Sequence, residues 1–251
     1  MANSLAGFLS ELGEVGLLTR DFARLLVRRP FEARLLIEQL DNVGVKSFTV
    51  VNLTAIFSAM VLALQTGTLL GKFGAKIYVS RIIGLSLFRE LGPVLTALMI
   101  GGRVGAGITA ELGAMNVTEQ IDALRALGAN PVKKLVVPRV LATMIMLPTL
   151  TLIADGFGIL GGMLIGVAQL GLGANYFLGS LMQMTQLSDV FGGFLKAAVF
   201  GYIIAIIACA KGLGASGGAG GVGRATTSTV VTASVSILVS DFFLTKVLLS
   251  L

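Results

Sequence analysis

The chain has 251 residues, of which 55% are apolar and only 13% are charged, whereas a soluble domain carries about 25% charged residues. The absence of histidine and the presence of one cysteine, Cys209, exclude a Ser-His-Asp triad, a histidine metal site and an intramolecular disulfide. Lysine and arginine number 19 against 13 acidic residues. These cations flank apolar runs, so they are interpreted as membrane topology signals and not as a nucleic-acid surface.

The N-terminal region has helical amphipathic periodicity over residues 5–29. Its apolar positions recur at helical spacing and its charged positions lie opposite, until Pro30 ends the pattern. We expect a helix in the membrane interface, and a helix packed on a soluble partner is the alternative. A second amphipathic piece covers about 31–44. The predicted organisation is therefore 1–44 as interfacial and connecting helices, followed by one transmembrane domain over 45–251.

The remaining chain predicts an all-α membrane protein with about five transmembrane helices. Apolar runs this long can cross a hydrocarbon core of about 30 Å. The third is too long for one straight crossing, so we expect it to tilt or to begin at the surface. Glycines spaced by four at Gly158, Gly162 and Gly166 predict close helix crossings. The predicted spans cover residues 47–70, 83–108, 135–168, 190–211 and 228–250.

The lysines and arginines give the spans an orientation. Most of them precede the first span, lie in the loop around 103–139, or follow the fourth span. Cytoplasmic loops carry the excess of positive charge in membrane proteins. We therefore expect a cytoplasmic N-terminus and an external C-terminus.

The loop between the second and third spans predicts a short cytoplasmic helix over 116–128. Asn116 and Glu119 have capping-box spacing, and Gly128 suits a helix stop. About three turns would lie between them. Such a helix, with charged and apolar faces, could dock into a groove on another protein, and an ordinary surface helix is the alternative. The side chains expected to make the docking face are Glu119, Gln120, Asp122, Leu124 and Arg125.

Several separate motifs occur in a fixed order along the chain. They are Leu-Phe-Arg-Glu-Leu-Gly-Pro at 87–93, Gly-Gly-Arg-Val-Gly-Ala at 101–106, Thr-Ala-Glu-Leu-Gly at 109–113, Thr-Glu-Gln at 118–120, Pro-Arg at 138–139 and Gly-Val-Gly-Arg-Ala-Thr-Thr at 221–227. From about residue 40 to its end, the chain resembles the MlaE family of ABC permeases. The spacing of Glu119, Gly128 and Pro138 likewise resembles the coupling loop of ABC-transporter permeases.

The resemblance implies a homodimeric permease in the bacterial inner membrane, with its C-terminus in the periplasm. Its implied partners are a cytoplasmic ABC ATPase (MlaF-type), a STAS-domain protein (MlaB-type) and a periplasmic MCE protein (MlaD-type). The implied substrates are phospholipids moved between inner and outer membranes, which maintains outer-membrane lipid asymmetry. No catalytic residue, metal or cofactor is expected in this chain, because ATP and Mg²⁺ would be bound by the ATPase.

Arg89 and Glu90 are the candidate polar residues of a lipid cavity. Ionisable groups within a span are costly, so they usually face protein or a water-filled cavity. The resemblance places their motif at a cavity in the dimer interface, where Arg89 would attract a lipid phosphate beside Glu90. Structural ion pairing between helices is the alternative. Three apolar residues, Leu91, Leu62 and Leu69, would line the acyl-chain region.

Other charged residues in or near the spans are expected to be structural. Arg103 and Glu111 are interpreted as anchors near the short helix. Pairing between helices is the expectation for Asp155, Lys196 and Asp241.

Two glycine motifs need separate interpretation. Residues 218–223 match G-x-G-x-x-G, but spans on both sides exclude a dinucleotide fold, so a flexible cytoplasmic turn is predicted. Gly71-Lys72 is followed by Phe73, which excludes a phosphate-binding loop and implies that another chain supplies the energy. A secondary lipid or sterol transporter, or a structural scaffold for a periplasmic lipid-binding protein, remains an alternative function.

Overall fold

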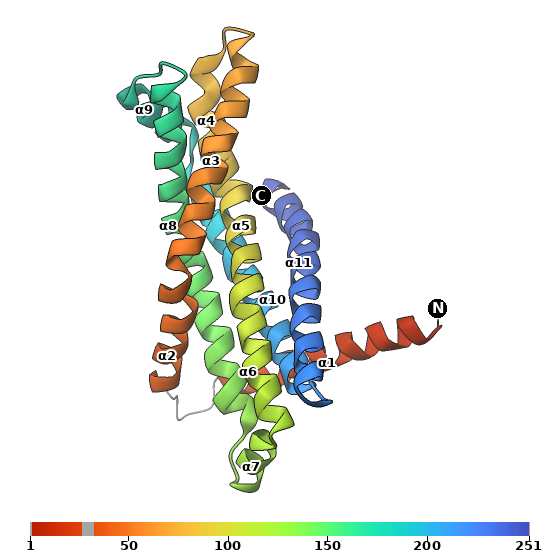
Figure 1. Cartoon of the computed structure of the whole chain (residues 1–251). Helices are drawn as coiled ribbons and strands as arrows, with labels where there is room; N and C mark the ends of the chain where they lie inside the picture. The colour runs from red at the N-terminus through yellow and green to blue at the C-terminus, as the bar shows by residue number, and fades with distance from the viewer. Residues whose placement is uncertain (1, 27–32, 251) are drawn as a thin grey trace.

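The computed structural model describes residues 2–26 and 33–250, and for residues 2–12 and 249 it describes the backbone alone. Within these ranges the chain is all-α and contains no strand, which confirms the predicted fold class. Figure 1 shows an elongated bundle with α1 lying across it near one end. The bundle has two ends, one at α7 and one at α9, and these serve as reference points below (Figure 1).

The first half of the chain builds α1 and two long helical runs. The elements are α1 (Ala2–Leu26), α2 (Ala33–Val43), η1 (Val45–Ser47), α3 (Phe48–Gly71), η2 (Lys76–Tyr78), α4 (Val79–Ser86), η3 (Leu87–Leu91), α5 (Gly92–Ile100), η4 (Gly101–Gly105) and α6 (Ala106–Val117). Both η3 and η4 are π-helical turns inside one continuous run. Single π-helical turns free backbone carbonyls and are frequent at functional sites.

The second half contains the short helix and three further long helices. Its elements are α7 (Gln120–Ala126), the π-helical turn η5 (Val132–Val136), α8 (Val137–Ala168), α9 (Ala174–Met184), α10 (Leu187–Leu213) and α11 (Gly218–Ser250). In Figure 1, α11 lies along one side of the bundle, and the apolar stretches of α8 and α10 are more buried than that of α11.

Five segments of the described chain are long and apolar enough to cross a bilayer. They are Ala33–Gly71, Lys76–Val117, Val132–Ala168, Leu187–Leu213 and Gly218–Leu248. The predicted number of spans is confirmed, but the helices of the second and fifth extend beyond the predicted limits. Charged residues such as Lys76 and Glu111 lower the hydropathy at the two ends of the second span, Lys76–Val117, but the helix continues through them.

The glycine-rich segment at 218–223 corrects one prediction. It forms the first turns of α11 and is not a flexible turn. The chain reverses just before it, where Gly217 and Gly218 have φ of +86° and +69°. Glycine adopts this left-handed conformation without a Cβ clash, so a glycine-rich sequence serves both the reversal and the helix start.

The core consists of two apolar clusters held by close helix packing. The larger joins α5, α6, α8, α10 and α11, and the smaller joins α3, α4, α8 and α9. A β-carbon at Gly201 of α10 would lie 2.6 Å from the carbonyl oxygen of Thr143 in α8, so only glycine permits this approach. The predicted glycines Gly158, Gly162 and Gly166 pack against α4, η3 and α9, which confirms close crossings and places them within one protomer.

The N-terminal helix is tied to the bundle through its last turns. Leu18 and Phe22 are buried, and the Tyr202 hydroxyl of α10 donates a hydrogen bond to Thr19 Oγ1 at 2.6 Å. The predicted end of this amphipathic segment, including Arg28 and Pro30, lies outside the described residues, as do the side chains of Leu5, Phe8, Leu9 and Leu12.

Candidate functional site

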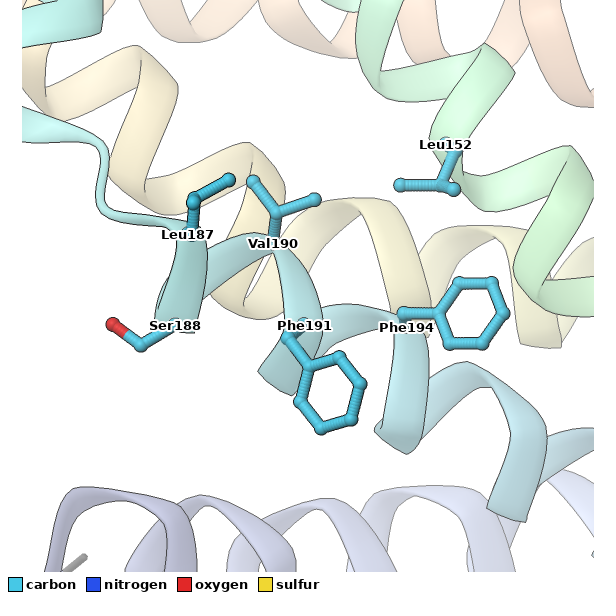
Figure 2. Close-up of a pocket in the computed structure, with 6 residues that line it drawn as sticks. All are labelled: Leu152, Leu187, Ser188, Val190, Phe191 and Phe194. Atoms are coloured by element: carbon cyan, nitrogen blue, oxygen red, sulfur yellow. The ribbon is translucent and has the colours of Figure 1, made fainter.

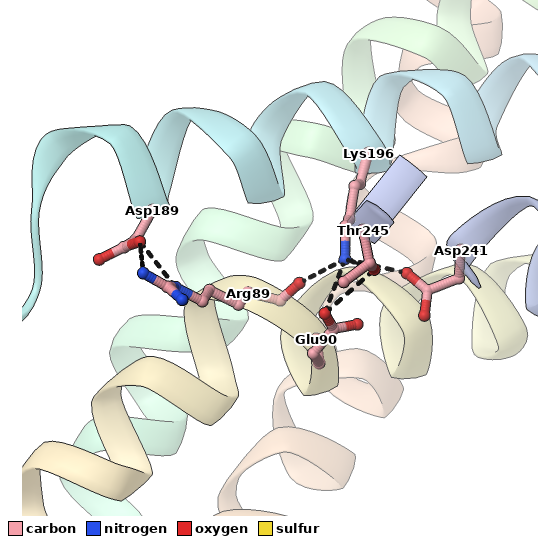
Figure 3. Close-up of polar contacts among 6 residues, drawn as sticks. All are labelled: Arg89, Glu90, Asp189, Lys196, Asp241 and Thr245. Atoms are coloured by element: carbon pink, nitrogen blue, oxygen red, sulfur yellow. Dashed lines mark hydrogen bonds and ion pairs between the residues drawn. The ribbon is translucent and has the colours of Figure 1, made fainter. Parts of the chain in front are cut away.

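A network of charged side chains joins η3, α10 and α11 in the membrane-spanning part of the bundle (Figure 3). Arg89 contacts Asp189 at 2.6 Å, and Glu90 contacts Lys196 at 3.0 Å. Lys196 also contacts Asp241 at 3.1 Å and donates a hydrogen bond to Thr245 Oγ1 at 2.6 Å. Neighbouring residues Arg89 and Glu90 therefore point to different partners, as the 100° step of a helix requires.

Local backbone geometry brings these helices together. Lys196 Nζ donates to the carbonyl oxygen of Arg89 at 2.8 Å, and this carbonyl belongs to the π-helical turn η3. A β-carbon at Gly193 would lie 2.1 Å from the carbonyl oxygen of Phe88, so α10 can approach η3 only because residue 193 is glycine. The sequence thus provides both an irregular turn and a glycine opposite it.

The network has a buried side and a half-exposed side. The side chains of Lys196 and Asp189 are 3% and 5% exposed, whereas those of Arg89 and Glu90 are 44% and 40% exposed. Buried charges in a membrane protein must be paired, because isolated ions are poorly solvated there. Lys196 and Asp189 therefore hold Glu90 and Arg89 in place while leaving both with accessible surface.

An apolar hollow of about 630 Å³ begins in the same turn of α10 as Asp189. Figure 2 shows its lining, with Phe191 and Phe194 projecting from α10 and Leu152 facing them from α8. Leu187, Ser188 and Val190 complete the wall. The hollow therefore lies along the first turns of α10, the helix that also carries Asp189.

The predicted acyl-chain residues have different environments. Leu62 of α3 and Leu91 of η3 are half-buried and pack on the same apolar cluster. Leu69 is 59% exposed near the end of α3, so it does not join them.

The short helix α7 is shorter than predicted and starts differently. Asn116 lies in the last turn of α6, and its side-chain amide donates a hydrogen bond to the Ala215 carbonyl oxygen at 3.0 Å. The predicted capping box of Asn116 and Glu119 is therefore wrong. Glu119 instead turns the chain in the left-handed region at φ 60°, which costs a non-glycine residue about 1–2 kcal/mol. The predicted stop is confirmed, because Gly128 has φ +74°.

Most of α7 faces outward. Glu119 and Gln120 are exposed, and the exposed side chains of Asp122 and Arg125 form an ion pair at 2.7 Å. Leu124 is half-buried, while Leu127 is 82% exposed and does not share the buried face of Ile121. This leaves a charged surface with one exposed leucine at the α7 end of the bundle.

Of the two predicted anchors, Glu111 lies near α7, whereas Arg103 lies in η4, at the far end of α6 from α7. Glu111 of α6 contacts Arg139 of α8 at 2.7 Å, and Arg103 donates to Ser47 Oγ at 2.5 Å. Both contacts connect separate helical runs, which confirms the structural interpretation. Pairing between helices is confirmed for Lys196 and Asp241 but not for Asp155, whose buried Oδ1 has no hydrogen-bond partner in the described part of the chain.

Sequence reasoning missed Asp189 as a member of the network. Its position at the start of α10 serves a second purpose, because it closes a capping box with Gln186. Asp189 lies one residue before the predicted fourth span, where a carboxylate three residues after a helix N-cap is only a capping signal, and its nearness to Arg89 becomes visible only when α10 packs on η3. Thr245 was also missed, because α11 brings it to Lys196 and Glu90 only when the helices pack.

Fold and site together define a multi-pass membrane protein with a charged network in its spans and an exposed helix between the second and third. The family model described as Permease MlaE matches residues 36–247. The chain belongs to the MlaE permease family, whose members are ABC transporter permeases. A permease of this class works with an ATPase partner.

Similar proteins come from different bacteria and from a plant. A probable ABC transporter permease protein of Rickettsia typhi is 46% identical over 223 residues, 89% of this chain and 86% of the relative. The intermembrane phospholipid transport system permease protein MlaE of Haemophilus influenzae is 35% identical over 253 residues, 99% and 95% of the two chains. The chloroplastic protein TRIGALACTOSYLDIACYLGLYCEROL 1 of Arabidopsis thaliana is 38% identical over 210 residues, 84% of this chain and 60% of the relative.

Proposed function

We propose that this permease moves phospholipids between the inner and outer membranes of a bacterium and thereby maintains outer-membrane lipid asymmetry. The name of the Haemophilus influenzae relative supports phospholipid transport. The proposal rests on Arg89 and Glu90, which are charged and half-exposed within an apolar span. Charged groups in such a position can bind the polar headgroup of a lipid. Arg89 would attract the phosphate, and the apolar hollow along the first turns of α10 would accommodate acyl chains.

The proposed assembly is a homodimer in the inner membrane, with the α7 end in the cytoplasm and the C-terminus in the periplasm. The distribution of lysine and arginine supports this orientation. ATP hydrolysis on a separate cytoplasmic ATPase would move α7, and this motion would open or close a lipid cavity between the two copies. A STAS-domain protein and a periplasmic MCE protein are the further proposed partners.

The headgroup role is tested by crosslinking a photoactivatable phospholipid to the purified complex. Replacing Arg89 and Glu90 by alanine should lower crosslinking about tenfold, because a hydrogen bond to a charged group contributes about 1.5 kcal/mol. Arg81→Ala is the matched control, since Arg81 is a half-buried cation of α4 that bonds Ser180. Equal crosslinking of the double variant and the control would contradict the headgroup role.

A further inference from the structure

A continuous surface groove lies between α1, α10 and α11 at the α7 end of the bundle. Its apolar part has a volume of about 630 Å³ and is walled mainly by Tyr202, Ile206, Val231, Val235 and Val239. A second hollow of about 350 Å³ adjoins it and contains Lys211, Arg224 and Ser228. Both hollows share Glu14, Ala210 and Lys211, so the apolar groove ends in a polar, cationic pocket.

The cationic pocket favours an anion. Lys211 Nζ donates to Ser228 Oγ at 2.9 Å, which holds the ammonium at the junction of the two hollows. Arg224 is exposed and forms no ion pair with any carboxylate of the described chain. Glu14 is the one carboxylate among the described lining residues. Arg224 and Lys211 therefore lie together at the end of an apolar groove.

The length of the apolar part matches one leaflet of a bilayer. From Val231 to Val239 the groove follows α11 for about 12 Å at 1.5 Å per residue, and half of a hydrocarbon core is about 15 Å. The small side chains Thr232, Ser236 and Ser240 in the groove could also accept a helix, and the experiment below separates the two occupants.

We propose that this groove binds an anionic phospholipid of the leaflet at the α7 end, with its phosphate at Arg224 and Lys211 and its acyl chains along α10 and α11. The charges complement an anionic headgroup, and each basic residue near a membrane surface favours anionic lipid by about 1 kcal/mol. This site is separate from Arg89 and Glu90, and it concerns binding and not transport. The proposed lipid site can therefore be tested independently of the proposed transport function.

The test uses the full chain in nanodiscs of phosphatidylcholine with a trace of phosphatidylglycerol carrying a photoactivatable acyl chain. Labelled peptides should come from 202–211 and 231–240, and unlabelled phosphatidylglycerol should compete better than phosphatidylcholine. Arg224→Ala should lower labelling about fivefold, whereas Arg224→Lys should keep most of it. Lys72→Ala should have no effect, because it removes an exposed cation directly after the C-terminus of α3, outside the groove.

A groove-filling variant provides the second arm. Ser236→Phe should block labelling, and Leu238→Phe, on the exposed side of α11, should leave it unchanged. Should Ser236→Phe fail to purify as a folded protein, Arg224→Ala and Arg224→Lys decide the matter. Equal labelling around all spans, or equal competition by both headgroups, would overturn the proposal. Crosslinking of the groove to a helix of a second copy or another protein would also overturn it.

Discussion

Lys196 is the most constrained charge of the spans, because it is almost fully buried and contacts groups from two other elements. Its ammonium lies 3.0 Å from a Glu90 oxygen and 3.1 Å from an Asp241 oxygen, and it also bonds the Arg89 carbonyl. An ammonium so placed loses nearly all its water, and only such partners compensate the loss. Lys196 therefore fixes the position of Glu90 relative to α10 and α11.

Removing this charge should destabilise the protein strongly. Lys196→Met keeps the aliphatic stem but leaves Glu90 and Asp241 without their shared cation, which should cost about 3 kcal/mol and lower the Tm by roughly 10 °C. Thermal unfolding in detergent measures the effect, with Lys246→Met as control because Lys246 is exposed on the same end of α11. Adding Asp241→Asn to Lys196→Met should restore part of the loss. Unfolding at the temperature of the control would contradict the structural role of Lys196.

At the scale of elements, α7 is the segment whose composition and exposure best suit a protein contact. Glu119, Asp122 and Arg125 are exposed, and Leu127 adds an apolar side chain beside them. The Glu111–Arg139 ion pair connects α6 and α8 at the base of α7, so a force on α7 reaches two long helices. Movement of α7 would accordingly shift α6 and α8, which belong to the second and third spans.

Charge reversal on α7 should weaken binding of the ATPase. Changing Glu119 and Asp122 to arginine should cost about 2 kcal/mol, or on the order of thirtyfold in affinity, if each makes an exposed ion pair with the ATPase. Co-purification of the ATPase with the tagged permease measures this. Asp41→Arg on α2 is the control, because Asp41 is also exposed but lies outside α7. Unchanged recovery of ATPase with the α7 variant would rule out this helix as the contact.

The elements differ in how far the sequence could predict them. Long apolar runs predicted the spans, since hydropathy depends on composition over many residues. Local signals were less reliable: Asn116 and Glu119 have capping-box spacing, yet Asn116 bonds Ala215 across the bundle. The charged network could not be predicted in full, because Arg89 and Asp189 are 100 positions apart and meet only through helix packing at Gly193.

At the scale of the whole molecule, the five spans are unequally covered. The most apolar windows of α8 and α10 are half buried inside the bundle, whereas that of α11 is the least buried. Apolar side chains such as Leu238, Phe242 and Phe243 cover its outer face. In a bilayer this face contacts lipid or another helix, which fits the proposed dimer.

As a whole, this permease is proposed to move phospholipid at the expense of ATP hydrolysed on another chain. The most direct measurement is transfer of a labelled phospholipid to acceptor vesicles by the complete complex in proteoliposomes, with and without ATP. We expect transfer with hydrolysable ATP, little transfer with a non-hydrolysable analogue, and loss of transfer with Arg89→Ala and Glu90→Ala. Equal transfer without ATP would indicate a secondary transporter, and no transfer under any condition would indicate a scaffold; either result would contradict the proposed function.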